Sequence, residues 1–180
     1  MTENINLQNL VKSFQEAVNR KEINNVLAMF TEDAEFELVG VSKYSGKEQI
    51  KNQFEYDAGV NGELKFIDFT FEENTVHCQL IERNDRLAAM GISELTFPSC
   101  AIVFQDGLIQ SFSAKVSPEM VQHNTEVWQK FVPWCKENHP NEYSKMFTSE
   151  GRFIYNRENG AGVVPLMRKW REEQKENKLP

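Results

Sequence analysis

Four short segments with the pattern of β-strands follow one another in the middle of the chain and constrain its fold more than any other feature. They cover residues 64–71, 75–83, 95–104 and 108–116. Alternating apolar and polar residues place every second side chain on the same face of a sheet. Asp106-Gly107 predicts a hairpin between the last two, because such turns need positive φ angles. An antiparallel meander is therefore expected, with a bulge or an edge at Pro98.

The chain before this meander has mainly helical spacing. Apolar residues recur every three or four positions over residues 6–19 and again over 23–30, whereas residues 34–40 alternate as a strand does. A third helix is expected after Ser45, which has the spacing of a capping box with Glu48, and it ends at Gly59 or Gly62. Helices gathered over an antiparallel sheet indicate an α+β fold. If the sheet is strongly bent, the helices close its open side and form a cone with an interior pocket.

Four motifs accompany this order of elements. They are Val11-x-x-Phe14-x-x-Ala17-Val18-Asn19, Met29-Phe30-Thr31-Glu32-Asp33-Ala34-Glu35-Phe36, Tyr44-x-Gly46-x-x-x-Ile50 and Phe104-Gln105-Asp106-Gly107-Leu108-Ile109. Together they resemble the nuclear transport factor 2-like superfamily, in its SnoaL-like and ketosteroid isomerase-like branch, over about residues 5–117. The resemblance implies a cone-shaped, cystatin-like α+β barrel that commonly forms homodimers. It does not imply one function, because this superfold hosts enzymes, carriers and binding modules.

The catalytic positions of a ketosteroid isomerase are vacant in this sequence. Such an enzyme uses a tyrosine donor, an aspartate base and a protonated acid. The resemblance places these roles on Phe14, Leu38 and Cys100, and none of the three side chains can perform them. We therefore predict no steroid isomerase activity. The Asp-Arg-Asp set of epoxide hydrolase relatives is not recognisable either, because Arg83 and Asp85 would lie side by side on one strand face.

The interior of the cone is predicted to be apolar. If Cys100 faces inward, the pocket lining comprises Phe14, Val18, Leu38, Phe54, Cys78, Leu80 and Cys100, with the Tyr44 hydroxyl at the rim. Glu82 continues the face of Cys78 and Leu80, and apolar surroundings would raise its pKa. It is the best candidate for a general acid or base, the alternative being a solvated or salt-bridged strand end. Asn84 or Asp85 is expected to cap a short helix.

Composition excludes several classes of function. The net charge of -7 and the pI of about 5.1 argue against partners rich in phosphate, so neither nucleic acid nor an anionic membrane is expected. The N-terminal Met1-Thr2-Glu3-Asn4 lacks the features of a secretory signal, and a cytoplasmic protein is predicted. The three cysteines form neither a CxxC motif nor a Cys/His cluster. Reduced thiols are therefore expected, with no metal and no cofactor.

The last third of the chain differs from the rest in charge. The balance is -8 over residues 1–117 and +1 over residues 118–180, so we divide the chain there into a SnoaL-like domain and a helical extension. Phe131 and Phe147 have the spacing of Phe14 and Phe30, and residues 146–153 repeat the pattern of 29–36 at an offset of 117. This self-similarity predicts a truncated second helix-helix-strand-helix unit, the alternative being two helical hairpins with similar spacing.

The extension cannot bury its own apolar face. Its aromatic residues are Trp128, Trp134, Phe147, Phe153 and Trp170. We expect it to dock on the first domain or on a dimer partner, as a lid over the pocket or as part of the dimer interface. Pro133 is expected to kink or break its first helix.

Three functions are compatible with these features. The first is a module that binds a small, largely apolar or aromatic molecule in the cone pocket, and the vacant isomerase positions favour it. The second is an enzyme similar to polyketide cyclases, isomerases or dehydratases, with Glu82 as its acid or base. The third is a protein-interaction or dimerisation module. The sequence does not decide whether the protein is an enzyme.

Overall fold

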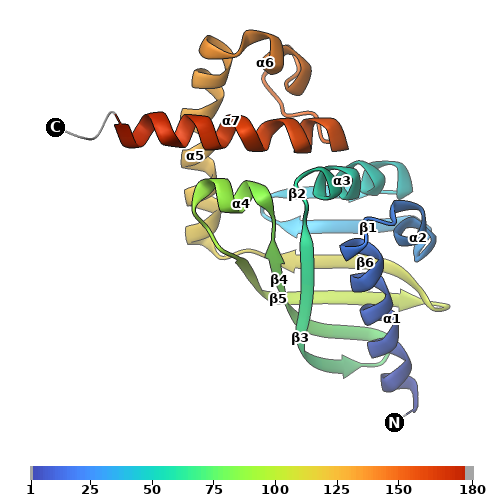
Figure 1. The fold of residues 1–180 in the computed structure, drawn as a ribbon. Coiled ribbons are helices and arrows are strands. Elements are labelled where there is room, and N and C mark those ends of the chain that lie inside the picture. The colour runs from blue at the N-terminus through green and yellow to red at the C-terminus, as the bar shows by residue number, and fades with distance from the viewer. Residues whose placement is uncertain (1, 177–180) are drawn as a thin grey trace.

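The chain folds into a curved six-stranded sheet covered by helices, with a helical layer at one end (Figure 1). A computed structural model describes residues 2–176. The helices are α1 (Thr2–Asn19), α2 (Ile23–Ala28), α3 (Lys47–Gly59), α4 (Asp85–Met90), α5 (Pro118–Asn138), α6 (Pro140–Met146) and α7 (Arg157–Glu176). The strands are β1 (Phe30–Val39), β2 (Ser42–Ser45), β3 (Glu63–Glu72), β4 (Thr75–Arg83), β5 (Leu95–Gln105) and β6 (Leu108–Lys115).

The sheet has the order β2-β1-β6-β5-β4-β3. The predicted meander forms its larger part, and β1 joins it by pairing in parallel with β6. Asp106 and Gly107 turn the β5–β6 hairpin with φ angles of 52° and 80°. The expected irregularity near Pro98 is a register shift, since Cys78 pairs with Cys100 but Leu80 pairs with Phe97. The α+β cone predicted from the sequence is confirmed.

Aromatic side chains fill the interior of this cone. Phe14 lies at its centre, with ring centroids 5.7 Å from Phe30 and 5.8 Å from Phe54, both in edge-to-face geometry. Phe36 stacks on Phe112 at 4.7 Å. Burying a phenylalanine side chain stabilises a fold by roughly 1.5–3 kcal/mol, and close aromatic pairs add to this. The middle of the cone is therefore a packed core.

Local structure departs from the sequence-based predictions at three places. Gly46, with a φ of 78°, begins α3 in place of Ser45, whose backbone N–H donates to Gln49 Oε1 at 3.1 Å. Strand β2 was not predicted, because four residues are too few to show a period. Helix α5 continues through Pro133 without a break. A proline removes one backbone hydrogen bond, and the buried neighbours Phe131 and Cys135 offset that loss by packing.

The extension has the same order of elements as the start of the chain. Helix α2 begins at Ile23 and α6 begins at Pro140, which is the offset of 117 residues seen in the sequence. The counterpart of β1 does not join the sheet, because Phe147 and Phe153 form a bridge with each other across a turn at Gly151. The element order agrees with a truncated repeat, and its origin by duplication stays a prediction.

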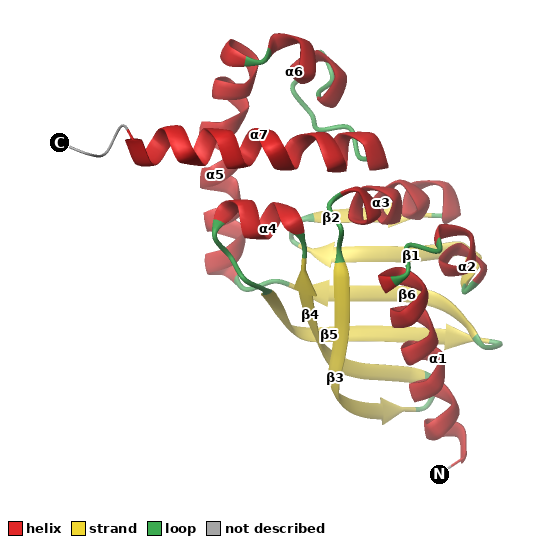
Figure 2. Cartoon of the chain, in the orientation of Figure 1, coloured by secondary structure: helices red, strands yellow, loops and turns green. Residues whose placement is uncertain are grey.

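Helix α7 lies across α3 and α4 and joins the extension to the cone (Figure 2). A second core forms between them, and its buried members are Tyr56, Val60, Ala89, Phe131, Cys135, Met146, Phe147, Val163, Val164, Leu166 and Met167. Polar contacts border this core: Arg157 Nε donates to Glu55 Oε2 at 2.7 Å, and Arg171 Nη1 donates to the Ala89 carbonyl at 3.1 Å. The apolar face of the extension is thus covered by its own chain.

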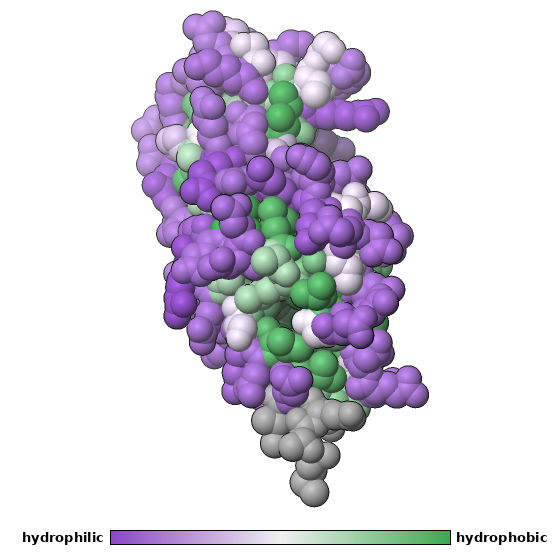
Figure 3. Space-filling model, turned by 90° about the vertical axis from the view of Figure 1, so that its right-hand side faces the viewer, coloured by the Kyte–Doolittle hydropathy of each residue, from purple (hydrophilic) through white to green (hydrophobic). Residues whose placement is uncertain are grey.

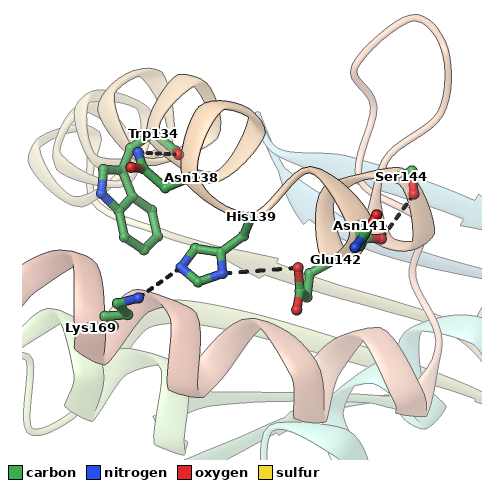
Figure 4. Close-up of polar contacts among 7 residues, drawn as sticks. All are labelled: Trp134, Asn138, His139, Asn141, Glu142, Ser144 and Lys169. Carbon is green, nitrogen blue, oxygen red and sulfur yellow. Dashed lines mark hydrogen bonds and ion pairs between the residues drawn. The ribbon is translucent and has the colours of Figure 1, made fainter.

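His139 ties the turn between α5 and α6 to α7 (Figure 4). Its Nε2 lies 3.3 Å from Lys169 Nζ, and its Nδ1 lies 3.9 Å from Glu142 Oε2. A charged lysine only donates, so Nε2 accepts and Nδ1 carries the proton that faces the carboxylate. Nearby, Trp134 Nε1 donates to Glu173 Oε2 at 2.7 Å. These contacts hold the distal side of the extension together.

The surface is mostly hydrophilic. Figure 3 shows one face on which apolar residues gather in a strip down the middle, with hydrophilic residues on both sides. Among the residues that the structure describes, no helix is long and apolar enough to cross a membrane. Dimerisation stays a prediction.

Candidate functional site

A pocket of about 260 Å³ lies where the end of the cone meets the extension. One part of its wall is apolar and comprises Leu38, Val41, Leu87, Met90, Leu95, Phe97, Val116, Met120, Val121 and Trp128. The polar part gathers two carboxyl groups, an arginine, three amides and two tyrosines: Gln53, Tyr56, Asp57, Glu82, Asn84, Arg86, Asn124 and Tyr155. A mostly apolar pocket with a few convergent polar groups is the usual form of a small-molecule site.

Helix α3 positions the first carboxyl group. Gln53 and Asp57 are one turn apart, and Gln53 Nε2 donates to Asp57 Oδ1 at 2.8 Å. The Tyr44 hydroxyl donates to Gln53 Oε1 at 2.9 Å, which fixes the orientation of the buried amide. One oxygen of Asp57 is therefore held by a donor, and Oδ2 is left to carry a proton into the pocket.

The end of β4 positions the second carboxyl group. Asn84 Nδ2 donates to Glu82 Oε1, and Asn84 Oδ1 accepts from the Leu87 backbone N–H at 2.7 Å. The second bond caps α4, as predicted for Asn84, and costs about 1 kcal/mol when lost. Because the cap fixes the amide, its N–H₂ group must face Glu82. The capping residue of α4 thus also orients a pocket carboxylate.

Arg86 brings a positive charge to these two acids. Its Nη1 donates to Asn124 Oδ1 at 2.9 Å, and its guanidinium carbon lies 6.0 Å from the centroid of the Trp128 ring. Its Nε is buried without a hydrogen-bond partner among the residues described. An unpaired buried donor is costly unless something accepts from it. Arg86 therefore has a donor free for an oxygen atom of a ligand.

Burial perturbs both carboxyl groups. Loss of hydration raises the pKa of Asp57 well above its usual range, and the nearby Glu82 charge raises it further. Loss of hydration also raises the pKa of Glu82, with Arg86 and the Asn84 amide opposing the rise. Both side chains keep some accessible surface, which the pocket supplies. Two coupled acids titrate as a pair, so we assign the neutral form to Asp57 and the ionised form to Glu82.

The two pocket tyrosines stay neutral. Loss of hydration raises the pKa of Tyr56 and of Tyr155. Their rings meet edge to face with centroids 4.9 Å apart. Both hydroxyls are consequently hydrogen-bond donors at neutral pH.

The residues predicted for the pocket fall into two groups. Glu82 and Leu38 line it. The structure instead places Phe14, Val18, Phe54, Cys78, Leu80 and Cys100 in the packed core of the cone. The physical reason is volume, because the phenylalanines around Phe14 occupy the space that was predicted to be hollow. Tyr44 lies behind the pocket and reaches it through Gln53.

Cys100 has no environment that would make it a nucleophile. It is paired with Cys78 across β4 and β5, and both thiols are buried. Its contact with Cys78 and its burial raise the pKa of Cys100. A thiolate is the reactive form, so this cysteine is an inert part of the core.

The sequence did not reveal Asp57 and Arg86. A signal for Asp57 exists, because it continues the buried stripe of Ile50 and Phe54 on α3, where a charged residue is unexpected. Arg86 has no such signal, since a helix of six residues shows no reliable face. An acid-arginine-acid set is therefore present, and α3, β4 and α4 supply one member each.

No metal site accompanies this set. Within residues 2–176, no group of three or more His, Cys, Asp or Glu side chains could hold a metal ion.

Comparisons with known proteins relate this fold to solved structures. No family model matches the sequence, and no curated protein does. SalBIII, an epoxide hydrolase/cyclase-like enzyme with a role in pyran ring formation in the polyether salinomycin, matches over 66% of this chain and 96% of its own, with 15% identity and a TM-score of 0.58. An NTF2-like protein of unknown function from Cytophaga hutchinsonii matches over 64% and 94%, with 16% identity and a TM-score of 0.53. The fold is nuclear transport factor 2-like.

A third match has the same limits. An LEH-like epoxide hydrolase of M. tuberculosis covers 64% of this chain and 85% of its own, with 18% identity and a TM-score of 0.53. Identities this low establish the nuclear transport factor 2-like fold and leave the function open. About a third of the present chain lies outside each match, and the cone of residues 1–117 accounts for about the share that is matched. The extension is thus an addition to the nuclear transport factor 2-like cone, and it supplies part of the pocket wall.

Proposed function

We propose that this protein is an acid-base enzyme that opens an epoxide on a small, largely apolar molecule. The observation that carries the proposal is the pairing of Asp57 with Glu82 beside Arg86 at one side of an apolar pocket. Epoxide opening needs a proton donor for the leaving oxygen and a base for the attacking nucleophile. Two carboxyl groups of unequal pKa are suited to these two roles.

The proposed reaction balances without any other reactant. Neutral Asp57 donates its proton to the epoxide oxygen while the C–O bond breaks. Glu82 accepts a proton from a water molecule as the water oxygen bonds to the carbon, and a vicinal diol forms. If a hydroxyl group of the substrate attacks instead, the product is a cyclic ether. A proton passing from Glu82 to Asp57 restores the starting state.

Neighbouring groups support this assignment. The Arg86 charge opposes the rise in the pKa of Glu82 and so favours its ionised form. The free Nε–H of Arg86 and the tyrosine hydroxyls are donors for an oxygen on which negative charge develops. The apolar wall binds hydrocarbon and excludes bulk water, which strengthens these interactions. A volume of about 260 Å³ is at the small end of ligand pockets and limits the substrate to a small molecule.

The solved structures of similar fold lend further support. One is described as an epoxide hydrolase/cyclase-like enzyme and another as an epoxide hydrolase. Their identity to this chain is too low to transfer an activity, so the proposal depends on the residues of the pocket itself.

A binding module without catalysis is the second candidate. The apolar wall and the vacant isomerase positions at Phe14, Leu38 and Cys100 favour it. It makes a different prediction about the carboxyl pair. A pure binder would hold apolar molecules equally well after Asp57→Asn, whereas an acid-base enzyme would lose turnover.

Hydrolysis of simple epoxides tests the proposal. Styrene oxide, cyclohexene oxide and an epoxide with an internal hydroxyl group are incubated with the protein in H₂¹⁸O, and products are measured by mass spectrometry. We expect a diol or cyclic ether above background, and a loss of about 10²–10⁴-fold in rate for Asp57→Asn and for Glu82→Gln. Glu94→Gln, a surface change on the Arg83 salt bridge, is the matched control. No turnover of any epoxide, or full activity of both pocket variants, would contradict the proposal.

A further inference from the structure

We propose that Asn124 of the helical extension is a positioning residue, which holds the Arg86 guanidinium beside the carboxyl pair and so completes the site of the cone. The inference rests on the proposed function for its catalytic consequence, whereas the contact itself is independent of any reaction. It assigns to the extension a role that the cone alone cannot fill.

The first step concerns what holds Arg86. The backbone of its helix α4 is fixed at one end by the Asn84 cap and at the other by Arg171, which donates to the Ala89 carbonyl. The guanidinium is separated from this backbone by four rotatable bonds. Its hydrogen bonds within the described residues go to Met90 Sδ at 3.8 Å and to Asn124 Oδ1 at 2.9 Å. A thioether is a weak acceptor, so Asn124 supplies the contact that fixes the direction of the charge.

The second step concerns how firmly Asn124 is placed. Helix α5 follows β6 directly, and its cap is Ser117, whose Oγ accepts from the Met120 backbone N–H at 3.3 Å. Asn124 lies in the second turn after this cap. Trp128, one turn further on, lies with its ring beside the same guanidinium. Two side chains on one face of α5 therefore contact Arg86, one through a hydrogen bond and one through its π face.

The third step is the electrostatic consequence. Arg86 opposes the rise in pKa that burial imposes on Asp57 and on Glu82. A guanidinium released from Asn124 would spend time away from the acids, because an unfixed arginine side chain regains conformational freedom. Glu82 would then hold its proton to higher pH. Since the proposed base must be ionised, the acidic limb of the pH–rate profile would move to higher pH.

The other groups that face Arg86 do not replace Asn124. Tyr56 from α3 and Tyr155 from the extension are neutral, and their electrostatic influence on Arg86 is small while they keep their protons. Lys21 influences Asp57 from a greater remove, as the weakest of its partners. The position of the Arg86 charge is thus the variable that one hydrogen bond controls.

The test compares two variants of one helix. Asn124→Leu removes the acceptor with little change in size, and Gln122→Leu makes the same chemical change at an exposed position of α5 outside the pocket. The side-chain carboxyl carbons of Asp57 and Glu82 are followed by ¹³C NMR from pH 4 to 9 in the full chain. We expect Asn124→Leu to raise the titration midpoint of Glu82 by about half a pH unit or more. Gln122→Leu should match the wild type.

Turnover of styrene oxide provides the second measurement. We expect kcat/KM of Asn124→Leu to fall by about tenfold at pH 6, with the acidic limb moved upward by the same amount as the NMR midpoint. If Asn124→Leu does not fold, judged by circular dichroism, Asn124→Ala takes its place. Titration curves identical to those of Gln122→Leu would overturn the proposal. A wild type without epoxide turnover would refute the proposed function, while the NMR comparison would still decide the role of Asn124.

Discussion

The contact between α3 and α7 can be tested with two glycines on one helix. Gly160 faces α3, where an added Cβ would lie 2.7 Å from the Tyr56 carbonyl oxygen and 3.2 Å from Gly59 Cα. Gly162, two residues further along α7, would place a Cβ 3.8 Å from Met146 Sδ, which is an ordinary contact. Both substitutions by alanine make the same change in the unfolded chain. Their difference therefore isolates the packing of α7 on α3.

The structure gives the expected magnitudes. Alanine gains about 0.5–1 kcal/mol over glycine inside a helix, and Gly162→Ala should keep that gain. At Gly160 the same gain is opposed by a backbone contact that must open by several tenths of an ångström. Overpacking of this kind typically costs about 1–3 kcal/mol. We expect Gly160→Ala to be less stable to unfolding than Gly162→Ala by about 1–3 kcal/mol, which corresponds to a Tm lower by about 2–12 °C.

Urea and thermal unfolding, followed by circular dichroism, measure this difference. Tryptophan fluorescence adds a local signal, since all three tryptophans lie in the extension and pack against the second core. The Tyr56 backbone precedes Asp57, so Gly160→Ala should also lower the activity more than Gly162→Ala does. Equal stability of the two variants would refute the docking of α7 on α3 as the structure shows it.

Three further outcomes are expected. Because burial raises the pKa of Asp57, the folded state retains a proton that the unfolded state loses near pH 4; stability then falls as the pH rises from there through the folded pKa, by about 1.4 kcal/mol for each pH unit. Asp57→Asn should abolish that fall in urea unfolding at pH 5 and pH 8, and an unchanged slope would contradict the assigned burial. Asn84→Ala should cost about 1 kcal/mol by removing the α4 cap, measured as a lower urea midpoint. Arg171→Leu should cost about 0.5–1.5 kcal/mol through the lost bond to Ala89, whereas the exposed Lys175→Leu should change little.

The fold could be predicted from the sequence because its signals are local. A period of two over β4, the Asp106-Gly107 turn and the proline irregularity in β5 each follow from backbone geometry within a few residues. Strand β2 and the start of α3 were missed for the same reason, since short elements depend on partners elsewhere. The parallel pairing of β1 with β6 also joins distant segments, and only the resemblance to a known fold implied it.

The site was predicted only in part, because it depends on which spaces are filled. Glu82 could be found from the alternation of β4. The neighbouring positions Cys78 and Leu80 were expected to line a cavity, but the phenylalanines around Phe14 occupy it. Volume is a property of the assembled core, and period alone does not report it. Asp57 needed the same information, because the open space lies at the far end of its helix.

The extension and the acid pair depend on each other physically. A carboxyl group at the open end of a cone would be hydrated and keep its ordinary pKa. Asp57 instead follows Tyr56, which belongs to the second core, and the pocket beside it is walled by Trp128 and Tyr155 of the extension. The burial that separates the two acids into donor and base is thus partly a result of the docking of α5 and α7. Residues that never approach a substrate, such as Gly160, therefore set the chemistry of the pocket through the water that they help to exclude.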